Sequence, residues 1–393
     1  MIRKLTSCIL VVVLAACGAA VAPFPAEAAY ETQSRAAILY DVETDTILFE
    51  KNADEALPPA SMSKLMTLYM LFEALRDGRV TLDTTFSVST KARLMGGSTM
   101  FLDETDRPSV EELIKGIVVQ SGNDACIVVA EGLAGTEDAF ARQMNQRAPD
   151  LGLTNSTFAN ASGWPNPNHR MSVRDLATLA TRIITEFPEY YGYFALEEFD
   201  FDGRSPSNRF NRNPVLGLGL GADGLKTGHT EEAGYGLVGS AKQGERRIVF
   251  VFTGLNSTIE RRQEAEAMIN WGFRQFLSKQ LATAGTPITD IPVWLGDFQQ
   301  LTAVAKDDID LLVPAVGQDT LETKVEYRTP LEAPIAEGQV VAELVVTARD
   351  MPEKRLPLVS DRAVARGGFL PRMRASSSVL FDKLMVQVQS LME

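Results

Sequence analysis

Ser61 and Lys64, three positions apart, are the residues whose types and spacing could do chemistry. Apolar residues recur at helical spacing from Met62 to Leu75, so both side chains would leave the start of one helix on the same face. A serine hydroxyl needs a base to remove its proton, and a lysine held away from water can have a pKa low enough to be that base. The pair predicts nucleophilic catalysis, although one such match is expected by chance on a solvated helix start.

Two further short patterns follow along the chain, Ser121-Gly-Asn123 and Lys226-Thr-Gly228, and each occurs once. The ordered set S-x-x-K, S-x-N and K-T-G is typical of penicillin-binding proteins and class A β-lactamases. Three patterns in the right order are far more specific than any one of them. The set indicates acyl transfer by a serine enzyme.

Longer segments around these patterns match one family closely: Pro59-Ala-Ser-Met-Ser-Lys-Leu-Met-Thr67, Ser121-Gly-Asn-Asp-Ala125 and Gly224-Leu-Lys-Thr-Gly-His-Thr230. The chain resembles the D-alanyl-D-alanine carboxypeptidases of the penicillin-binding protein 5 and 6 family, over nearly all of the mature sequence. The resemblance implies a β-lactamase- and transpeptidase-like catalytic domain. It also implies an enzyme that trims D-alanine from peptidoglycan stem peptides, acts in cell-wall maturation and cell shape, and is inhibited by β-lactams.

The resemblance assigns roles to the residues of the first pattern. Ser61 would attack the amide between two D-alanines, and Lys64 would be the base. Backbone N–H groups at Ser61 and His229 would form the oxyanion hole.

The other two patterns would complete this site. Ser121 can relay a proton to the leaving amine, and Asn123 can hold a substrate peptide group or Lys64. The strand with Lys226, Thr227 and Gly228 would line the site: its ammonium and hydroxyl face the substrate carboxylate, and the glycine allows close approach to the backbone.

A carboxypeptidase must also recognise a free carboxylate, which favours a guanidinium. By its offset from Trp271-Gly-Phe273, Arg261 matches the carboxylate-binding arginine of the family. Arg262 is the substitute, and an arginine pair on a solvated helix start is the competing interpretation.

Composition excludes several other functions. The net charge is −13, and the chain has no cluster of Lys and Arg residues of the kind that binds phosphates, which argues against a nucleic-acid partner. Only His169 and His229 are available for a Ser-His-Asp triad or a zinc site, and the family motif requires neither, so no metal or cofactor is expected. His169 ends the segment Asn160-Ala-Ser-Gly-Trp-Pro-Asn-Pro-Asn-His169, which is similar to a loop of the family, and it is interpreted as a structural residue. Cys126 lies in an apolar run and is interpreted as a buried small hydrophobe.

The N-terminus predicts export. Arg3 and Lys4 precede an apolar run that is too short to span a bilayer, and small residues end at Ala28-Ala29, so residues 1–29 are interpreted as a signal peptide. Cleavage would leave Cys126 as the single cysteine. A lipobox-like segment ending at Cys17 is the alternative, with a lipidated N-terminus.

The order of elements predicts an α+β catalytic domain over residues 30–283. Strand patterns at 35–40 and 46–50 form a hairpin, and helical patterns at 62–75, 110–117, 125–133 and 173–184 follow, the last capped by Ser172. Strands at 235–241 and 247–253 and a helix at 264–277 close the domain. This order favours an antiparallel sheet surrounded by helices.

After residue 283 the hydrophobic pattern of the sequence changes. Short alternating runs predict a small β-rich domain over 284–370, which we interpret as a spacer or interaction module. Residues 371–393 place Leu380, Phe381, Leu384 and Met385 on one apolar arc. This predicts an amphipathic helix. The helix would either dock on its own domain or attach a periplasmic enzyme peripherally to the inner membrane.

Three rival functions remain at this stage. A class A-type β-lactamase would need a Glu-x-x-x-Asn element between the second and third patterns, and none is present. A D,D-endopeptidase would share the acylation chemistry and differ in its leaving group. A non-enzymatic envelope scaffold would retain the fold alone.

Overall fold

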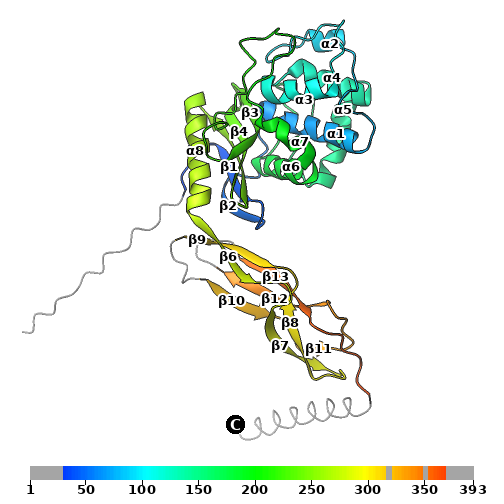
Figure 1. The fold of residues 1–393 in the computed structure, drawn as a ribbon, viewed down its shortest axis with the longest axis vertical. Coiled ribbons are helices and arrows are strands. Elements are labelled where there is room, and N and C mark those ends of the chain that lie inside the picture. The colour runs from blue at the N-terminus through cyan, green and yellow to red at the C-terminus, as the bar shows by residue number, and fades with distance from the viewer. Residues whose placement is uncertain (1–29, 316–320, 348–352, 369–393) are drawn as a thin grey trace, which may run out of the picture. The chain divides into compact units, whose positions relative to one another are not determined.

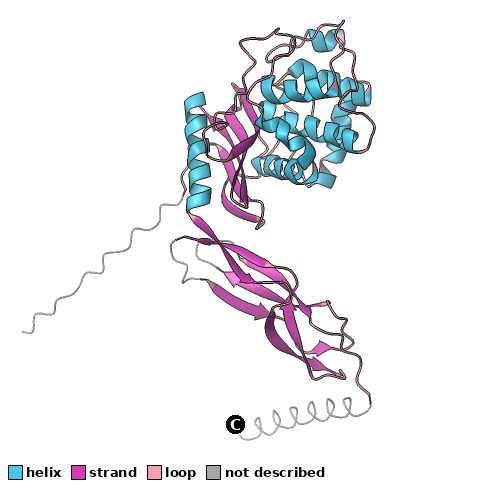
Figure 2. Ribbon diagram, in the orientation of Figure 1, coloured by secondary structure: helices cyan, strands magenta, loops and turns pink. Residues whose placement is uncertain are grey.

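The structure is a computed structural model that describes residues 30–315, 321–347 and 353–368. Figures 1 and 2 show helices against a β-sheet in the first part of the chain and strands in the second. The α+β class predicted from the order of elements is therefore confirmed. The signal peptide (1–29) and the amphipathic segment (371–393) lie outside the described residues. No described helix is both long and apolar enough to cross a membrane.

The first part is built on a five-stranded antiparallel sheet in the order β2-β1-β5-β4-β3. Its strands are β1 (Ala36–Asp41), β2 (Thr46–Lys51), β3 (Ala222–Thr230), β4 (Gly234–Gln243) and β5 (Arg246–Leu255). The predicted hairpins before residue 51 and around residue 244 are both present. The central strand β5 is buried on both faces, because α8 packs on one face of the sheet and α6 on the other (Figure 1).

Eight helices accompany this sheet among the described residues. They are α1 (Lys64–Arg76), α2 (Thr90–Arg93), α3 (Val110–Lys115), α4 (Asn123–Ala134), α5 (Glu137–Arg147), α6 (Val173–Glu186), α7 (Pro188–Tyr191) and α8 (Thr258–Arg274). Ser172 caps α6 as predicted, since its side chain accepts from the N–H of Asp175. Ser109 and Glu112 form a capping box at α3.

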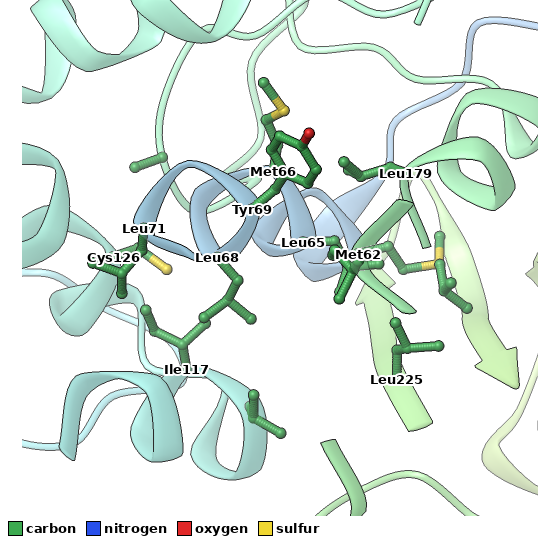
Figure 3. Packing of buried hydrophobic residues seen from close by; sticks show 14 of the residues in the cluster. Met62, Leu65, Met66, Leu68, Tyr69, Leu71, Ile117, Cys126, Leu179 and Leu225 are labelled. Atoms are coloured by element: carbon green, nitrogen blue, oxygen red, sulfur yellow. The ribbon is translucent and has the colours of Figure 1, made fainter. Parts of the chain in front are cut away.

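Helix α1 lies at the centre of the hydrophobic core. Leu65, Leu68 and Phe72 are fully buried, and other turns of the helix are apolar as well. A helix that is apolar all round must be enclosed by neighbours, and Figure 3 shows residues of α4, α6 and β3 around it. The residues at the start of α1 are therefore held by a helix that is enclosed in the core.

The second part is all-β and has a hydrophobic core of its own. A six-stranded sheet has the order β10-β12-β13-β8-β7-β11, and β6 pairs with β9. The strands are β6 (Phe276–Ala282), β7 (Pro287–Trp294), β8 (Gln300–Ala305), β9 (Ile309–Pro314), β10 (Glu322–Glu326), β11 (Leu331–Glu332), β12 (Val340–Thr347) and β13 (Lys354–Ser360). Because β6 pairs with β9, residues 276–282 join the later strands, whereas the sequence placed them at the end of the catalytic domain.

Candidate active site

Ser61 lies in a single 3₁₀ turn, Ala60–Ser63, that leads directly into α1. The turn follows Pro58-Pro59 and is closed by a hydrogen bond from the N–H of Met62 to the carbonyl of Pro59 at 3.2 Å. Lys64 is the first residue of α1, and its Nζ donates to the Ser61 Oγ at 2.8 Å. The structure thus brings together the pair that the sequence placed on one helical face.

The ammonium of Lys64 is fully buried and has three acceptors. Besides Ser61, it donates to the Asn123 Oδ1 and to the carbonyl of Ser162, each at 2.7 Å. A lysine ammonium has three N–H groups, so every one is used. Burial, with a smaller contribution from the positive charge of Arg212, lowers the pKa of Lys64 to about 8.

Ser121 and Asn123 are positioned by an irregular stretch between α3 and α4. A π-helical turn, Gly116–Gln120, ends at Ser121, which has left-handed φ and ψ angles of 57° and 37°. A serine in this region is uncommon and is typical of functional sites. Asn123 begins α4, and its Nδ2 donates to the carbonyl of Gly96 at 2.9 Å. This bond turns the amide oxygen towards Lys64.

Strand β3 forms the other wall of the site. Lys226 is buried, and its Nζ donates to the Ser121 Oγ at 3.0 Å and to the carbonyl of Thr227 at 3.2 Å. Burial, followed by the charges of Arg212 and Lys64, holds the pKa of Lys226 well below its usual value. Within the described residues β3 pairs only with β4, so its other edge offers backbone groups to a ligand.

Gly228 explains how closely this strand approaches the nucleophile. A Cβ at Gly228 would lie 3.0 Å from the carbonyl oxygen of Pro59 and 3.0 Å from the Met62 Cγ. In the structure this glycine allows β3 to lie close to the turn that carries Ser61. A larger residue would push β3 away from Ser61.

Arg261 is buried near the start of α8, whereas Arg262 is not. The Arg261 Nη2 donates to the carbonyl of Arg212 at 3.3 Å, and its guanidinium lies over the ring of Tyr235. Its Nε has no hydrogen-bond partner among the described residues. Burial and the charge of Arg212 lower the pKa of Arg261 to about 10. Arg262 is exposed and pairs with Glu266 at 2.7 Å.

The two histidines have different environments. His229 is exposed and stacks on Tyr235, with ring centroids 3.9 Å apart. His169 is buried, and its Nε2 lies 2.7 Å from the Ser63 Oγ. Burial and the charge of Lys64 lower the pKa of His169 to about 4, so it is neutral near pH 7 and serves the turn that carries Ser61. Cys126 is also buried, which raises its pKa to about 12.

Four cations converge on the site: Lys64, Lys226, Arg261 and Arg212. None of them forms an ion pair with a carboxylate of the described residues. The nearby carboxylate of Asp124 is taken by backbone N–H groups of Met100, Leu102 and Ala125. The cluster therefore lacks a negative partner, which a substrate carboxylate could supply.

Sequence reasoning missed Arg212, which donates to the carbonyl of Gln120 at 2.9 Å and acts on every other cation of the cluster. Arg212 lies in the loop before β3, where no motif marks it. Ser162 was also missed, because it contributes a carbonyl that any residue type could provide. In the part of the chain that the structure describes, no cluster of His, Cys, Asp and Glu could hold a metal ion.

Comparisons with known proteins agree with this geometry. A family model described as D-alanyl-D-alanine carboxypeptidase matches residues 23–257, and one described as penicillin-binding protein 5, C-terminal domain, matches residues 276–366. The D-alanyl-D-alanine carboxypeptidase DacC of Escherichia coli (strain K12) is 36% identical over 362 residues, covering 89% of this chain and 90% of that protein. DacF of Bacillus subtilis (strain 168) is 32% identical over 354 residues, covering 88% of each.

The solved structures agree as well. The crystal structure of penicillin binding protein 5 from Haemophilus influenzae has a TM-score of 0.77 at 30% identity, covering 86% of this chain and 100% of that one. The first family model alone spans more than half of the chain. With its serine–lysine pair and its two further motifs assembled in one site, the chain belongs to the D-alanyl-D-alanine carboxypeptidase family.

Proposed function

We propose that this chain removes the terminal D-alanine from peptidoglycan stem peptides through an acyl-enzyme on Ser61. The observation that carries the proposal is the contact of the buried Lys64 with Ser61, beside a cation cluster that has no carboxylate partner among the described residues. The first feature supplies a nucleophile and its base, and the second supplies recognition of a free C-terminus.

Acylation begins from the neutral form of Lys64. When its ammonium loses one proton, Asn123 and Ser162 still hold the two remaining N–H groups, so the lone pair is directed at Ser61. The amine removes the hydroxyl proton as the Ser61 Oγ attacks the carbonyl carbon between the two D-alanines. The low pKa of Lys64 makes this form accessible near neutral pH.

The tetrahedral intermediate then expels D-alanine. Backbone N–H groups of Ser61 and His229 stabilise the oxyanion. As the C–N bond breaks, the leaving nitrogen takes the proton that Lys64 removed from Ser61, relayed by the Ser121 hydroxyl, which is in contact with Lys226, so Lys64 is neutral again. Water hydrolyses the resulting ester, with Lys64 as the base, and this restores the Ser61 hydroxyl.

Recognition of the free carboxylate distinguishes this reaction from cleavage of crosslinks. Arg261, Lys226 and Thr227 would bind the carboxylate, and Arg212 adds to the positive field. A carboxylate placed here neutralises a cluster that is otherwise uncompensated among the described residues. This favours the carboxypeptidase over the endopeptidase.

The nucleophile is tested with labelled penicillin. Penicillin-binding protein D2 from Listeria monocytogenes, which is 29% identical and has a TM-score of 0.56, has been solved in an ampicillin-bound form. We expect a stable adduct on Ser61 that Ser61→Ala abolishes and Ser87→Ala, at an exposed serine, preserves. Labelling of the Ser61→Ala protein would show that the nucleophile is assigned wrongly.

Carboxylate recognition is tested with two neighbouring arginines. Arg261→Ala should lower kcat/KM on a peptide that ends in D-Ala-D-Ala by about 10-fold to 100-fold, because a charge-assisted hydrogen bond is worth about 1.5–3 kcal/mol. Arg262→Ala should have little effect, since Arg262 pairs with Glu266. An equal loss for Arg261→Ala on the C-terminally amidated peptide would contradict this role, and faster cleavage of a crosslinked dimer would favour the endopeptidase.

The sequence also supports a location for this activity. We propose that residues 1–29 direct export to the periplasm and that the apolar arc in 371–393 contacts the inner membrane; both segments lie outside the described residues. In a chain that starts at Tyr30, deletion of residues 371–393 should release the protein from lipid vesicles and leave penicillin acylation unchanged. Equal partitioning of the two forms would contradict the anchor.

A further inference from the structure

A groove separate from the catalytic residues lies between α6 and the hairpin of β1 and β2, which are neighbours in the fold (Figure 1). Its volume is about 470 Å³, which is within the range of small-ligand sites. None of the residues that line it in the described chain belongs to the three motifs or to the cation cluster. The reaction at Ser61 therefore leaves this groove without a function.

The groove exists because α6 turns short side chains towards the sheet. Ala177, Thr178 and Thr181 share one face of the helix and line the groove, at positions where longer side chains would fill it. Ile38 of β1 and Ala177 are buried and form its floor, whereas Thr178, Thr181 and Tyr40 bring hydroxyl groups to its walls. The groove therefore combines a carbon floor with hydroxyl-bearing walls.

Each charged group that lines the groove already has a partner. The pairs are Arg174 with Glu50 and Asp54, at 2.6 and 2.8 Å, Arg182 with Glu186, at 2.5 Å, and Asp45 with the hydroxyl of Tyr40. A charged ligand would have to displace one of these partners. A purely apolar ligand would remove water from the hydroxyls and ion pairs without replacing its hydrogen bonds. The lining thus favours a neutral ligand that has both C–H surface and hydrogen-bonding groups.

One hydroxyl of the groove has no use in the fold. The Thr181 Oγ1 is buried and has no hydrogen-bond partner among the described residues, which raises the free energy of the folded state. Threonine in a helix has two accessible χ1 rotamers, so a rotation about χ1 can turn this hydroxyl to the groove that the same side chain lines. A ligand with a donor or acceptor there would satisfy it.

We propose that this groove binds a neutral saccharide, a segment of the glycan strand of peptidoglycan. The C–H faces of a pyranose ring cover Ile38, and the hydroxyl and acetamido groups at its edge exchange hydrogen bonds with Thr178 and Thr181. The choice of this glycan as the source of the saccharide rests on the proposed hydrolysis at Ser61, whereas the binding of a saccharide does not. The groove holds the enzyme on the polymer whose stem peptides it trims.

The test titrates the full chain with N,N′-diacetylchitobiose, a neutral disaccharide of acetylated sugars, and follows binding by ligand-observed NMR. We expect a dissociation constant in the millimolar range, and the same value after Ser61 has been acylated with penicillin. Thr178→Trp fills the groove and should weaken binding by about 10-fold or more. Gln143→Trp, at an exposed position of α5, is the matched control and should leave binding unchanged.

A second variant, Thr181→Val, keeps the shape of the side chain and decides the question if Thr178→Trp does not fold. It should weaken binding about 3-fold to 10-fold, the range for one neutral hydrogen bond. It should also raise the midpoint of thermal unfolding of the free protein, because the unpaired buried hydroxyl is gone. A hydroxyl with only a structural role would give the opposite result, a lower midpoint with unchanged binding, and would overturn the site.

Three other outcomes bear on the proposal. Absence of binding to the unmodified protein, or equal binding by Thr178→Trp and Gln143→Trp, would overturn the saccharide site. Loss of binding after acylation would overturn it as well, because the disaccharide would then occupy the catalytic site. If the unmodified protein binds the disaccharide but penicillin does not label Ser61, the hydrolytic function has failed, and with it only the assignment of the saccharide to peptidoglycan.

Discussion

At the scale of single residues, the protonation state of Lys64 decides whether the site can react. Its burial removes the hydration that would stabilise an ammonium, and nearby Arg212 adds repulsion, so the pKa of Lys64 is lowered to about 8. A depressed pKa means that the neutral, basic form appears as pH rises through that value. The rate of acylation should follow this titration.

We expect the rate of penicillin acylation to rise about tenfold per pH unit below pH 8 and to level off above it. Arg212→Gln should move the midpoint to higher pH, because removing a neighbouring positive charge raises the pKa of Lys64. Stopped-flow acylation between pH 6 and 10 measures both profiles. Exposed Arg262, changed to Gln, is the control that should leave the midpoint in place. A midpoint that Arg212→Gln does not move would contradict the electrostatic cause.

Single residues also show what the sequence could predict about the site. The three short motifs supply side chains with fixed chemical roles, and the structure joins Ser61, Lys64 and Asn123 by hydrogen bonds and places the hydrogen-bonded pair of Ser121 and Lys226 in the same site. Arg212 had no motif to mark it, since its position depends on how separate loops meet. Distances of this kind come from tertiary packing and not from local spacing.

At the scale of elements, the loop at Gly163 links the base to the nucleophile turn. Gly163 has a φ of 76°, and a Cβ there would lie 1.9 Å from the carbonyl oxygen of Ala60. Ser61 follows Ala60 in the chain, and Lys64 donates to the carbonyl of Ser162, which directly precedes Gly163. The glycine is thus required both by its backbone conformation and by the close approach of two segments.

Gly163→Ala should slow acylation at least tenfold and lower the free energy of unfolding by about 2–4 kcal/mol, combining backbone strain with overpacking. Gly78→Ala separates these effects, because Gly78 has a φ of 70° but no atom near its Cβ position. It should cost about 1 kcal/mol and leave acylation unchanged. Urea unfolding and penicillin labelling give the two readouts. Similar acylation by both variants would contradict the importance of the junction.

The regular elements were largely predictable and the irregular ones were not. Alternation and helical periodicity located the two hairpins, α4 and α6, because each buries one face or a whole surface. The pattern at 110–117 predicted a helix, but the structure continues it as a π-helical turn that ends at left-handed Ser121. Periodicity carries no signal for such a turn. Mostly polar α5 was missed for the same lack of an apolar pattern.

At the scale of the whole molecule, two separate hydrophobic cores divide the described chain. One surrounds α1 and contains Leu65, and the other joins the strands of the second part and contains Leu358. Each of these leucines is fully buried. Because no buried residue is shared between the two cores, damage to one core should leave the packing of the other intact.

Leu358→Ala should lower the free energy of unfolding of the second part by about 2–5 kcal/mol. The rate of penicillin acylation at 25 °C should stay unchanged. The same substitution at Leu65 is the matched control and should slow acylation, since Leu65 adjoins the base on α1. Calorimetry and labelling provide the measurements. If Leu358→Ala slowed acylation as much as Leu65→Ala, the two cores would not be energetically independent.

The uncompensated cations of the resting site link catalysis to the ionic composition of the solution. Any small anion that binds among Lys226, Arg212 and Arg261 occupies the place of the substrate carboxylate and stabilises the folded chain by mass action. Released D-alanine carries the same group, so product and buffer anion compete for one position. The KM of this enzyme is consequently a property of the enzyme together with its counterions, and the assay buffer contributes to the specificity that is measured.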